Sequence, residues 1–195
     1  MTQTGHELEL TVSDINVDGG SVARHEGRVV FLDRGLPGER LRARVTGEKK
    51  RVLLAESLET LVLSPDAVEP FCRYFGQCGG CPVQNYAYPA QLELKRKQAA
   101  QVFSRIGGLD LRSVPDICAA DGLPRIIGSP KQSGYRNKME YAFGTADGRV
   151  TPGLRRRPPP EALDFQGLPL PGPAAAPALG PVRGRAHLPR LAPRP

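Results

Sequence analysis

Residues 5–62 alternate polar and apolar side chains in short runs that are separated by turn signals. The run over 7–12, Glu-Leu-Glu-Leu-Thr-Val, has the period of two that is typical of a half-buried strand. Glycine-containing turn signals interrupt such runs at Asp18-Gly19-Gly20, Glu26-Gly27 and Leu36-Pro37-Gly38-Glu39. Short strands joined by glycine-rich turns at this spacing favour a small closed barrel, so we predict an OB-like barrel over 5–62.

One predicted strand of this barrel carries arginines on a single face. Because side chains alternate along a strand, Arg40, Arg42 and Arg44 share one face of the run 40–45 and apolar side chains occupy the other. Such a face is either the solvated outside of the barrel or a surface that contacts phosphates. Charge of this kind supplies affinity for RNA without reading its sequence. The predicted RNA-binding residues are Arg24, Arg28, Arg40, Arg42, Arg44, Lys49, Lys50 and Arg51.

The overall charge is a weak guide to function in this chain. Lysine and arginine total 27 against 20 acidic residues, which gives a formal net charge of +7. Residues 151–195 hold seven arginines and two acidic residues, so the first 150 residues carry only +2 of that excess. The segment 158–195 is rich in arginine, proline and alanine, and we expect it to be disordered. It is either a disordered extension or the product of a shifted reading frame.

Three of the four cysteines stand in one short, glycine-rich segment. Cys72, Cys78 and Cys81 have the spacing C-x5-C-x2-C, and Cys118 follows 37 residues later. Glycine tolerates the backbone conformations that let several thiolates converge on one centre. The spacing favours an iron–sulfur cluster, while a zinc site and reduced structural or redox-active cysteines remain open. Cys118 is the one further candidate ligand, or else a buried cysteine packed as a small hydrophobe.

The segment after the cysteines predicts one amphipathic helix over 89–106. Pro89 suits a first helical turn, Gly107-Gly108 ends the pattern, and an apolar stripe at helical spacing is expected to be core. That stripe consists of Leu92, Ala99, Val102, Phe103 and Ile106. Beyond it, the run 114–119 is expected to be a strand, and Asp147-Gly148 is a hairpin turn signal.

The predicted fold class is mainly β with some α. We divide the chain into a barrel (5–62), a cysteine loop with its helix (63–108), the start of a β-containing central domain (109–157) and the tail (158–195). No run approaches the roughly 20 apolar residues of a membrane helix, and the first residues lack the pattern of a secretory signal. We therefore expect a cytoplasmic protein without a membrane partner.

The order of these features resembles the N-terminal part of the bacterial class I SAM-dependent RNA (uracil-5-)-methyltransferases, which make 5-methyluridine in 23S ribosomal RNA. The resemblance covers roughly residues 8–157, and the cysteine block is its most specific part. The motifs that carry it are Gly20-Ser21-Val22-Ala23-Arg24, Leu36-Pro37-Gly38-Glu39, Cys72…Cys78-Gly79-Gly80-Cys81 with Gln84, Gln91…Lys95 and Tyr135-Arg136-Asn137-Lys138.

The resemblance implies a TRAM barrel that binds structured RNA, with ribosomal RNA as the expected partner and no DNA. It implies that Cys72, Cys78 and Cys81 ligate a [4Fe–4S] cluster. The family's fourth cysteine falls where this chain has Leu168, so the fourth ligand is not identified. The family transfers methyl from S-adenosylmethionine to uridine C5, which needs a reactive cysteine, a base and a bound methyl donor.

The motifs of methyl transfer are missing from this chain. It contains no glycine-rich strand–turn–helix for S-adenosylmethionine, no Asp-Pro-Pro-Arg and no Ser-Cys-Asn-Pro with a nucleophile. We therefore expect the RNA-binding, cluster-bearing part of an RNA uracil-5-methyltransferase that is catalytically inactive alone. The alternative is a standalone RNA-binding module with a metal-stabilised cysteine loop. A radical methylthiotransferase, which also has a TRAM barrel, is a remoter alternative because its cysteine triad is spaced C-x3-C-x2-C and precedes the barrel.

Overall fold

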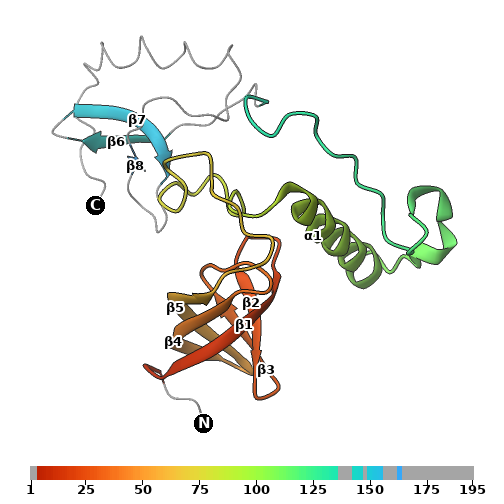
Figure 1. Ribbon diagram of the computed structural model, residues 1–195, viewed down its shortest axis with the longest axis horizontal. Coiled ribbons are helices and arrows are strands. Elements are labelled where there is room, and N and C mark those ends of the chain that lie inside the picture. Colours follow the sequence, from red (N-terminus) through yellow and green to blue (C-terminus); the bar gives the residue numbers. More distant parts are fainter. Residues whose placement is uncertain (1–3, 136–141, 147–148, 156–161, 164–195) are drawn as a thin grey trace, which may run out of the picture. The chain divides into compact units, whose positions relative to one another are not determined.

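Five strands of the protein close into a small barrel. The computed structural model describes residues 4–135, 142–146, 149–155 and 162–163. The barrel strands are joined in the order β1-β2-β3-β5-β4, and β1 also pairs with β4 (Figure 1). All pairs are antiparallel except β3 with β5. The strands are β1 (Glu7–Ile15), β2 (Ser21–His25), β3 (Arg28–Leu32), β4 (Arg40–Lys49) and β5 (Val52–Val62). The OB-like barrel expected from the sequence is confirmed.

The period-two pattern of the strands builds the core of the barrel. Six of the apolar side chains that point inward are at most 2% exposed, namely Leu10, Val12, Val30, Leu41, Val45 and Leu53. Along β4, every second residue from Leu41 to Val45 is buried and the arginines between them are exposed. The inner face therefore stabilises the fold, and the outer face is available for other contacts.

Gly35, in the connection between β3 and β4, meets a strict steric requirement. Its φ of +133° is a conformation that other residues rarely adopt. A Cβ at this position would lie 2.7 Å from Leu41 Cδ1 and 2.9 Å from Val12 Cγ2. Both of these side chains belong to the barrel core, so the core packs directly against this glycine.

The predicted helix forms, but its buried side differs from the prediction. Helix α1 (Tyr88–Gln101) continues as one π-helical turn, η1 (Val102–Ile106), and thus ends where expected. Its contacts with the barrel end run along Leu94, which joins a second apolar cluster, and Gln98, whose Nε2 donates to the Ile15 carbonyl at 2.8 Å. The expectation that the whole predicted stripe is core is wrong. Its C-terminal members Val102, Phe103 and Ile106 are exposed, whereas Leu94, which lies outside the predicted stripe, is buried.

Residues 109–128 follow the helix as short turns instead of the strand expected over 114–119. The turns are the 3₁₀ segments η2 (Leu111–Ser113) and η3 (Pro115–Ile117). A proline at the start of η3 has no N–H to donate to a strand ladder, which explains the difference. Arg96 of α1 holds this segment by donating to both Asp121 carboxylate oxygens at 2.7 Å and to the Pro124 carbonyl at 3.1 Å.

The described chain divides into two compact units. One consists of 1–70 with 82–128, and the other of 71–81 with 129–195. In the second unit, β6 (Ala142–Ala146) pairs with β7 (Arg149–Arg155), and β7 pairs with β8 (Ala162–Leu163), all antiparallel. The predicted turn at 147–148 and, apart from β8, the predicted tail lie outside the described residues. Within the described ranges, no helix combines the length and apolarity needed to cross a bilayer.

Candidate nucleic-acid interface and cysteine loop

The three arginines of β4 lie in a ladder of opposite charges. Arg42 Nη2 is 2.6 Å from Glu59 Oε2 on β5, and Arg44 Nη2 is 3.0 Å from Glu7 Oε1 on β1. Arg40 Nε is 4.0 Å from Glu9 Oε2. The glutamates were not among the predicted site residues, although Glu7 and Glu9 alternate with the same period as the arginines. Exposed pairs of this kind contribute little stability, but they offset the positive charge of this flank.

Arg28 lies at the other end of the barrel, where two hairpins meet. Its Nη2 is 2.6 Å from Glu48 Oε1, which joins the start of β3 to the end of β4. The Arg28 side chain is only 24% exposed, and its buried Nη2 makes no aligned hydrogen bond. The structure therefore places this predicted RNA-binding residue in a partly buried ion pair.

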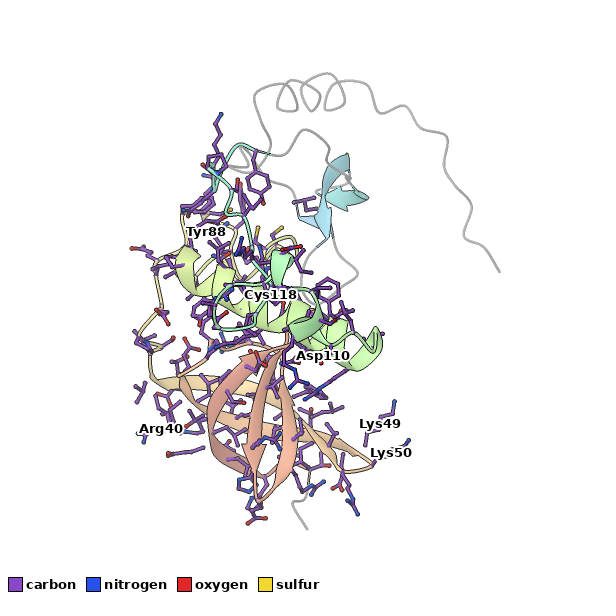
Figure 2. The ribbon with its side chains drawn as sticks, turned by 90° about the vertical axis from the view of Figure 1, so that its right-hand side faces the viewer. Arg40, Lys49, Lys50, Tyr88, Asp110 and Cys118 are labelled. Atoms are coloured by element: carbon purple, nitrogen blue, oxygen red, sulfur yellow. The ribbon has the colours of Figure 1, made fainter. Side chains whose placement is uncertain are left out.

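The remaining four predicted residues gather around the same two hairpins. Arg24 lies on β2, and Lys49, Lys50 and Arg51 form the tip between β4 and β5. All four are exposed, and none of them makes an ion pair with any described residue. Figure 2 shows Lys49 and Lys50 at this end of the barrel and Arg40 away from them on the other side. The eight predicted residues thus form a ladder of three compensated arginines, a separate ion pair of Arg28 with Glu48, and an uncompensated basic tip, not one patch. We call Arg24, Lys49, Lys50 and Arg51 the basic tip.

Lys50 has an unusual backbone conformation for its position in this tip. Its φ is +57°, in the left-handed region, and β4 and β5 are joined through Lys50 and Arg51 alone. A residue with a Cβ adopts this conformation at a cost of roughly 1–2 kcal/mol, whereas glycine adopts it readily. The neighbouring hairpin between β2 and β3 uses the more favourable sequence, Glu26-Gly27, with φ of 48° and 74°.

The three clustered cysteines lie in a loop of successive turns over 71–81. The Phe75 N–H donates to the Cys72 carbonyl at 2.9 Å, and the Cys78 N–H donates to the Tyr74 carbonyl at 2.9 Å. Gly76 has a φ of +82°, and Gly80 donates its N–H to Cys78 Sγ at 3.4 Å. All four cysteines lie in the described part of the chain, and none forms a disulfide.

Cys118 has a different environment from the cysteines of this loop. It belongs to the other compact unit and is 5% exposed. Its Sγ donates a hydrogen bond to the Leu111 carbonyl at 3.6 Å. Its backbone forms a bridge with Pro124. Burial and this hydrogen bond fit a packed structural thiol better than a metal ligand.

The donor chemistry of the loop fits an iron–sulfur cluster. Three thiols stand within ten residues, and the N–H of Gly80 gives Cys78 the type of hydrogen bond that stabilises a thiolate. Over the described residues, however, no three Cys, His, Asp or Glu side chains are grouped closely enough to hold a metal ion. Binding of a cluster would therefore have to draw the three thiols together.

The base of the cysteine loop is held within the first unit. Ala67 forms a bridge with Tyr86, and the Val68 N–H donates to the Asn85 carbonyl at 2.9 Å. Tyr86 is 7% exposed; burial first, and then nearby Asp66 and Asp14, raise the pKa of its phenol. The residues that precede the loop are thus paired with those that follow it, immediately ahead of α1 in the sequence.

Known proteins are similar to the barrel segment and to most of the chain. The TRAM domain family matches residues 2–58. A protein named uncharacterized RNA methyltransferase from Nitratidesulfovibrio vulgaris is 44% identical over 161 residues, which cover 82% of this chain and 32% of that protein. A protein of the same name from Clostridium tetani is 40% identical over 140 residues, which cover 72% of this chain and 28% of that protein. A solved structure of a conserved protein from Methanococcus maripaludis is 31% identical, covering 30% of this chain and 83% of that chain, with a TM-score of 0.29.

The barrel is therefore a TRAM domain. The chain as a whole belongs to the RNA methyltransferase family, to which most of its length is related at 31–44% identity. It spans about a third of the length of the curated relatives that it matches.

Proposed function

We propose that this chain binds RNA through the basic tip of its TRAM barrel. The observation that carries the proposal is the separation of charges on the barrel. Four arginines are offset by glutamates, while Arg24, Lys49, Lys50 and Arg51 make no ion pair with any residue that the structure describes. Cations without a partner release counterions when they meet phosphates, so they contribute most to affinity for RNA.

The experiment compares two double variants that remove the same charge from different places. Lys49→Gln with Arg51→Gln removes two cations of the basic tip, and Arg42→Gln with Arg44→Gln removes two members of the ladder. The dissociation constant for a structured RNA is measured by fluorescence anisotropy over a series of salt concentrations. The tip variant is expected to reduce the slope of log K against log salt by about 1.4 to 1.8, because each phosphate contact contributes about 0.7 to 0.9.

The ladder variant is the matched control. It changes the net charge by the same amount but removes arginines that already have acidic partners. Its slope of log K against log salt should therefore change by less than half as much as the slope of the tip variant. Equal effects of the two variants would contradict the proposal, because they would mean that only net charge matters.

The finer assignment concerns the RNA and the reaction that this binding serves. We propose that the RNA is ribosomal and that the reaction is methyl transfer from S-adenosylmethionine to uridine C5. Membership of the RNA methyltransferase family supports the reaction class. The sequence motifs for the methyl donor and the nucleophile are not found in these 195 residues, so the role assigned to this chain is binding and positioning of RNA.

We also propose that Cys72, Cys78 and Cys81 ligate a [4Fe–4S] cluster. Their concentration in one loop and the hydrogen bond that Cys78 Sγ accepts from Gly80 support this proposal. When bound, such a cluster would cross-link the loop through its thiolates. The test is iron and acid-labile sulfide analysis of protein purified without oxygen, and stoichiometric zinc without colour would exclude the cluster.

A further inference from the structure

The C-terminal end of the helical segment carries apolar side chains that the described part of the chain leaves uncovered. In the π-helical turn η1, Val102 is 42% exposed, Phe103 is 40% exposed and Ile106 is 82% exposed. Val102 and Ile106 are about one turn apart, so they lie on the same side of the helix, and Phe103 is next to Val102. The turns η2 and η3 that follow also contain no buried residue. We call Val102, Phe103 and Ile106 the η1 patch.

The η1 patch is the second half of an apolar stripe whose first half packs within the chain. Leu92 belongs to the same stripe, and a Cβ on Gly128 would lie 3.3 Å from Leu92 Cδ1 and 3.6 Å from Tyr88 Cε1. Arg96 holds the segment that leads to Gly128 through its hydrogen bonds to Asp121. The chain therefore packs against the stripe along α1 and leaves it exposed along η1, although the apolar spacing continues through both.

The surroundings of the η1 patch in the sequence are almost free of charge. Between Lys97 and Asp110 the chain has a single charged residue, Arg105, whereas 24% of the whole chain is charged. A face that only meets solvent is normally rich in charged side chains, and a surface that binds phosphates needs several cations. The centre of a protein–protein interface is depleted of charge and rich in apolar side chains. The composition therefore favours a protein partner for this surface.

The length of the relatives indicates which protein would cover the patch. The matched 161 residues are 32% of the Nitratidesulfovibrio vulgaris protein, so about two thirds of that protein has no counterpart here. The motifs for the methyl donor and the nucleophile are also not found in these 195 residues. In an RNA methyltransferase they would belong to that larger remainder, which we call the catalytic part. A stripe with the spacing of a core that the matched third leaves exposed is expected to pack against it.

We propose that the η1 patch docks onto the catalytic part of an RNA methyltransferase. This inference rests on the proposed methyl-transfer function and adds the surface through which the RNA-binding part and the catalytic part associate. Docking at η1 leaves the basic tip unused, because the two surfaces share no residue. The chain would then bind RNA with one surface and the catalytic part with the other.

The first experiment co-expresses the full chain with the catalytic part of the Nitratidesulfovibrio vulgaris relative. The parent should form a one-to-one complex, detected by copurification and sedimentation velocity. Ile106→Asp places a charge on a side chain that is already 82% exposed, so the variant should fold normally and bind about tenfold or more weakly. Leu63→Asp is the matched control, because Leu63 is 69% exposed and follows β5 outside the helical segment, and it should bind as the parent does.

A second measurement uses both proteins intact and decides the question if the catalytic part does not stay soluble. Hydroxyl-radical footprinting measures the exposure of side chains, with each rate normalised to that of a free peptide of the same sequence. Phe103 and Ile106 of this chain should be oxidised rapidly. The segment of the intact relative that aligns with residues 98–109 should be oxidised several times more slowly, because its own catalytic part covers it.

Equal binding by the parent and Ile106→Asp, or rapid oxidation of the aligned segment in the intact relative, would overturn the inference. Slow oxidation of Phe103 and Ile106 in this chain alone would also overturn it, because another part of the chain, or a second copy in dimers seen by sedimentation, would then cover the patch. The RNA titrations keep the two proposals apart. Ile106→Asp should keep the salt slope of the parent, so docking can fail while the basic-tip variant still lowers that slope. Equal slopes for the tip and ladder variants would contradict RNA binding at the tip and leave the docking result as measured.

Discussion

Replacing Lys50 by glycine is expected to change stability and RNA affinity in opposite directions. The lysine occupies the left-handed region at a φ of +57° in a connection of only two residues. Relief of that conformation favours the folded glycine variant by roughly 1–2 kcal/mol, and the greater freedom of glycine in the unfolded chain offsets about 0.5–1 kcal/mol of it. The net expectation is a gain of about 0.5–1 kcal/mol, or about 1–4 °C in melting temperature.

Lys50→Gln is the matched variant because it removes the charge and keeps the Cβ. Thermal unfolding followed by circular dichroism should give the order glycine above glutamine, with glutamine close to the parent. In the RNA titrations, both variants should reduce the salt slope by about 0.7 to 0.9 each, since each lacks one cation of the basic tip. Equal melting temperatures for the two variants would refute the argument from backbone strain, and an unchanged slope would refute the RNA contact.

Two further predictions concern the cysteines and the contact of α1 with residue 121. Cys78→Ser should abolish bound iron whereas Cys118→Ser should retain it, because Cys118 is a packed thiol; iron analysis of both variants checks this, and the reverse pattern would contradict the assignment. The hydrogen bond from Arg96, assisted by the Leu123 N–H, lowers the pKa of Asp121, so this carboxylate stabilises the fold above its unfolded pKa and loses that effect as the pH falls through its folded pKa. Asp121→Asn should therefore melt with a shallower dependence on acidic pH than the parent, and an identical dependence would exclude the linkage.

Local periodicity is enough to predict the barrel, because a period of two and the turn residues are properties of neighbouring positions. It predicted the hairpin at Glu26-Gly27, which the two positive φ values confirm. It could not predict which charges of the barrel are compensated. The partners of Arg42 and Arg44 come from β5 and β1, and these pairs exist only once the strands have taken their register.

The apolar residues that the helix buries likewise could not be predicted from local periodicity. Its bounds follow from proline and glycine, but its buried side follows from where it meets the barrel. A stripe chosen by spacing alone included Ile106, which is 82% exposed, and omitted Leu94, which is 8% exposed. Likewise, the local pattern does not indicate that the Phe31 ring faces outward, because the inward and outward positions of β3 are both apolar.

The paired base of the cysteine loop has a consequence for the order in which the protein assembles. Two pairs close the ends of the loop that carries the three cysteines, namely Ala67 with Tyr86 and Val68 with Asn85. The entropy of bringing those ends together is thus lost when the barrel and α1 fold, not when a ligand arrives. An ion or cluster bound by these thiols would then have to order only the residues inside the loop. The barrel and α1 would therefore fold without a bound ion or cluster, and removal of such a group by a chelator would leave the barrel intact.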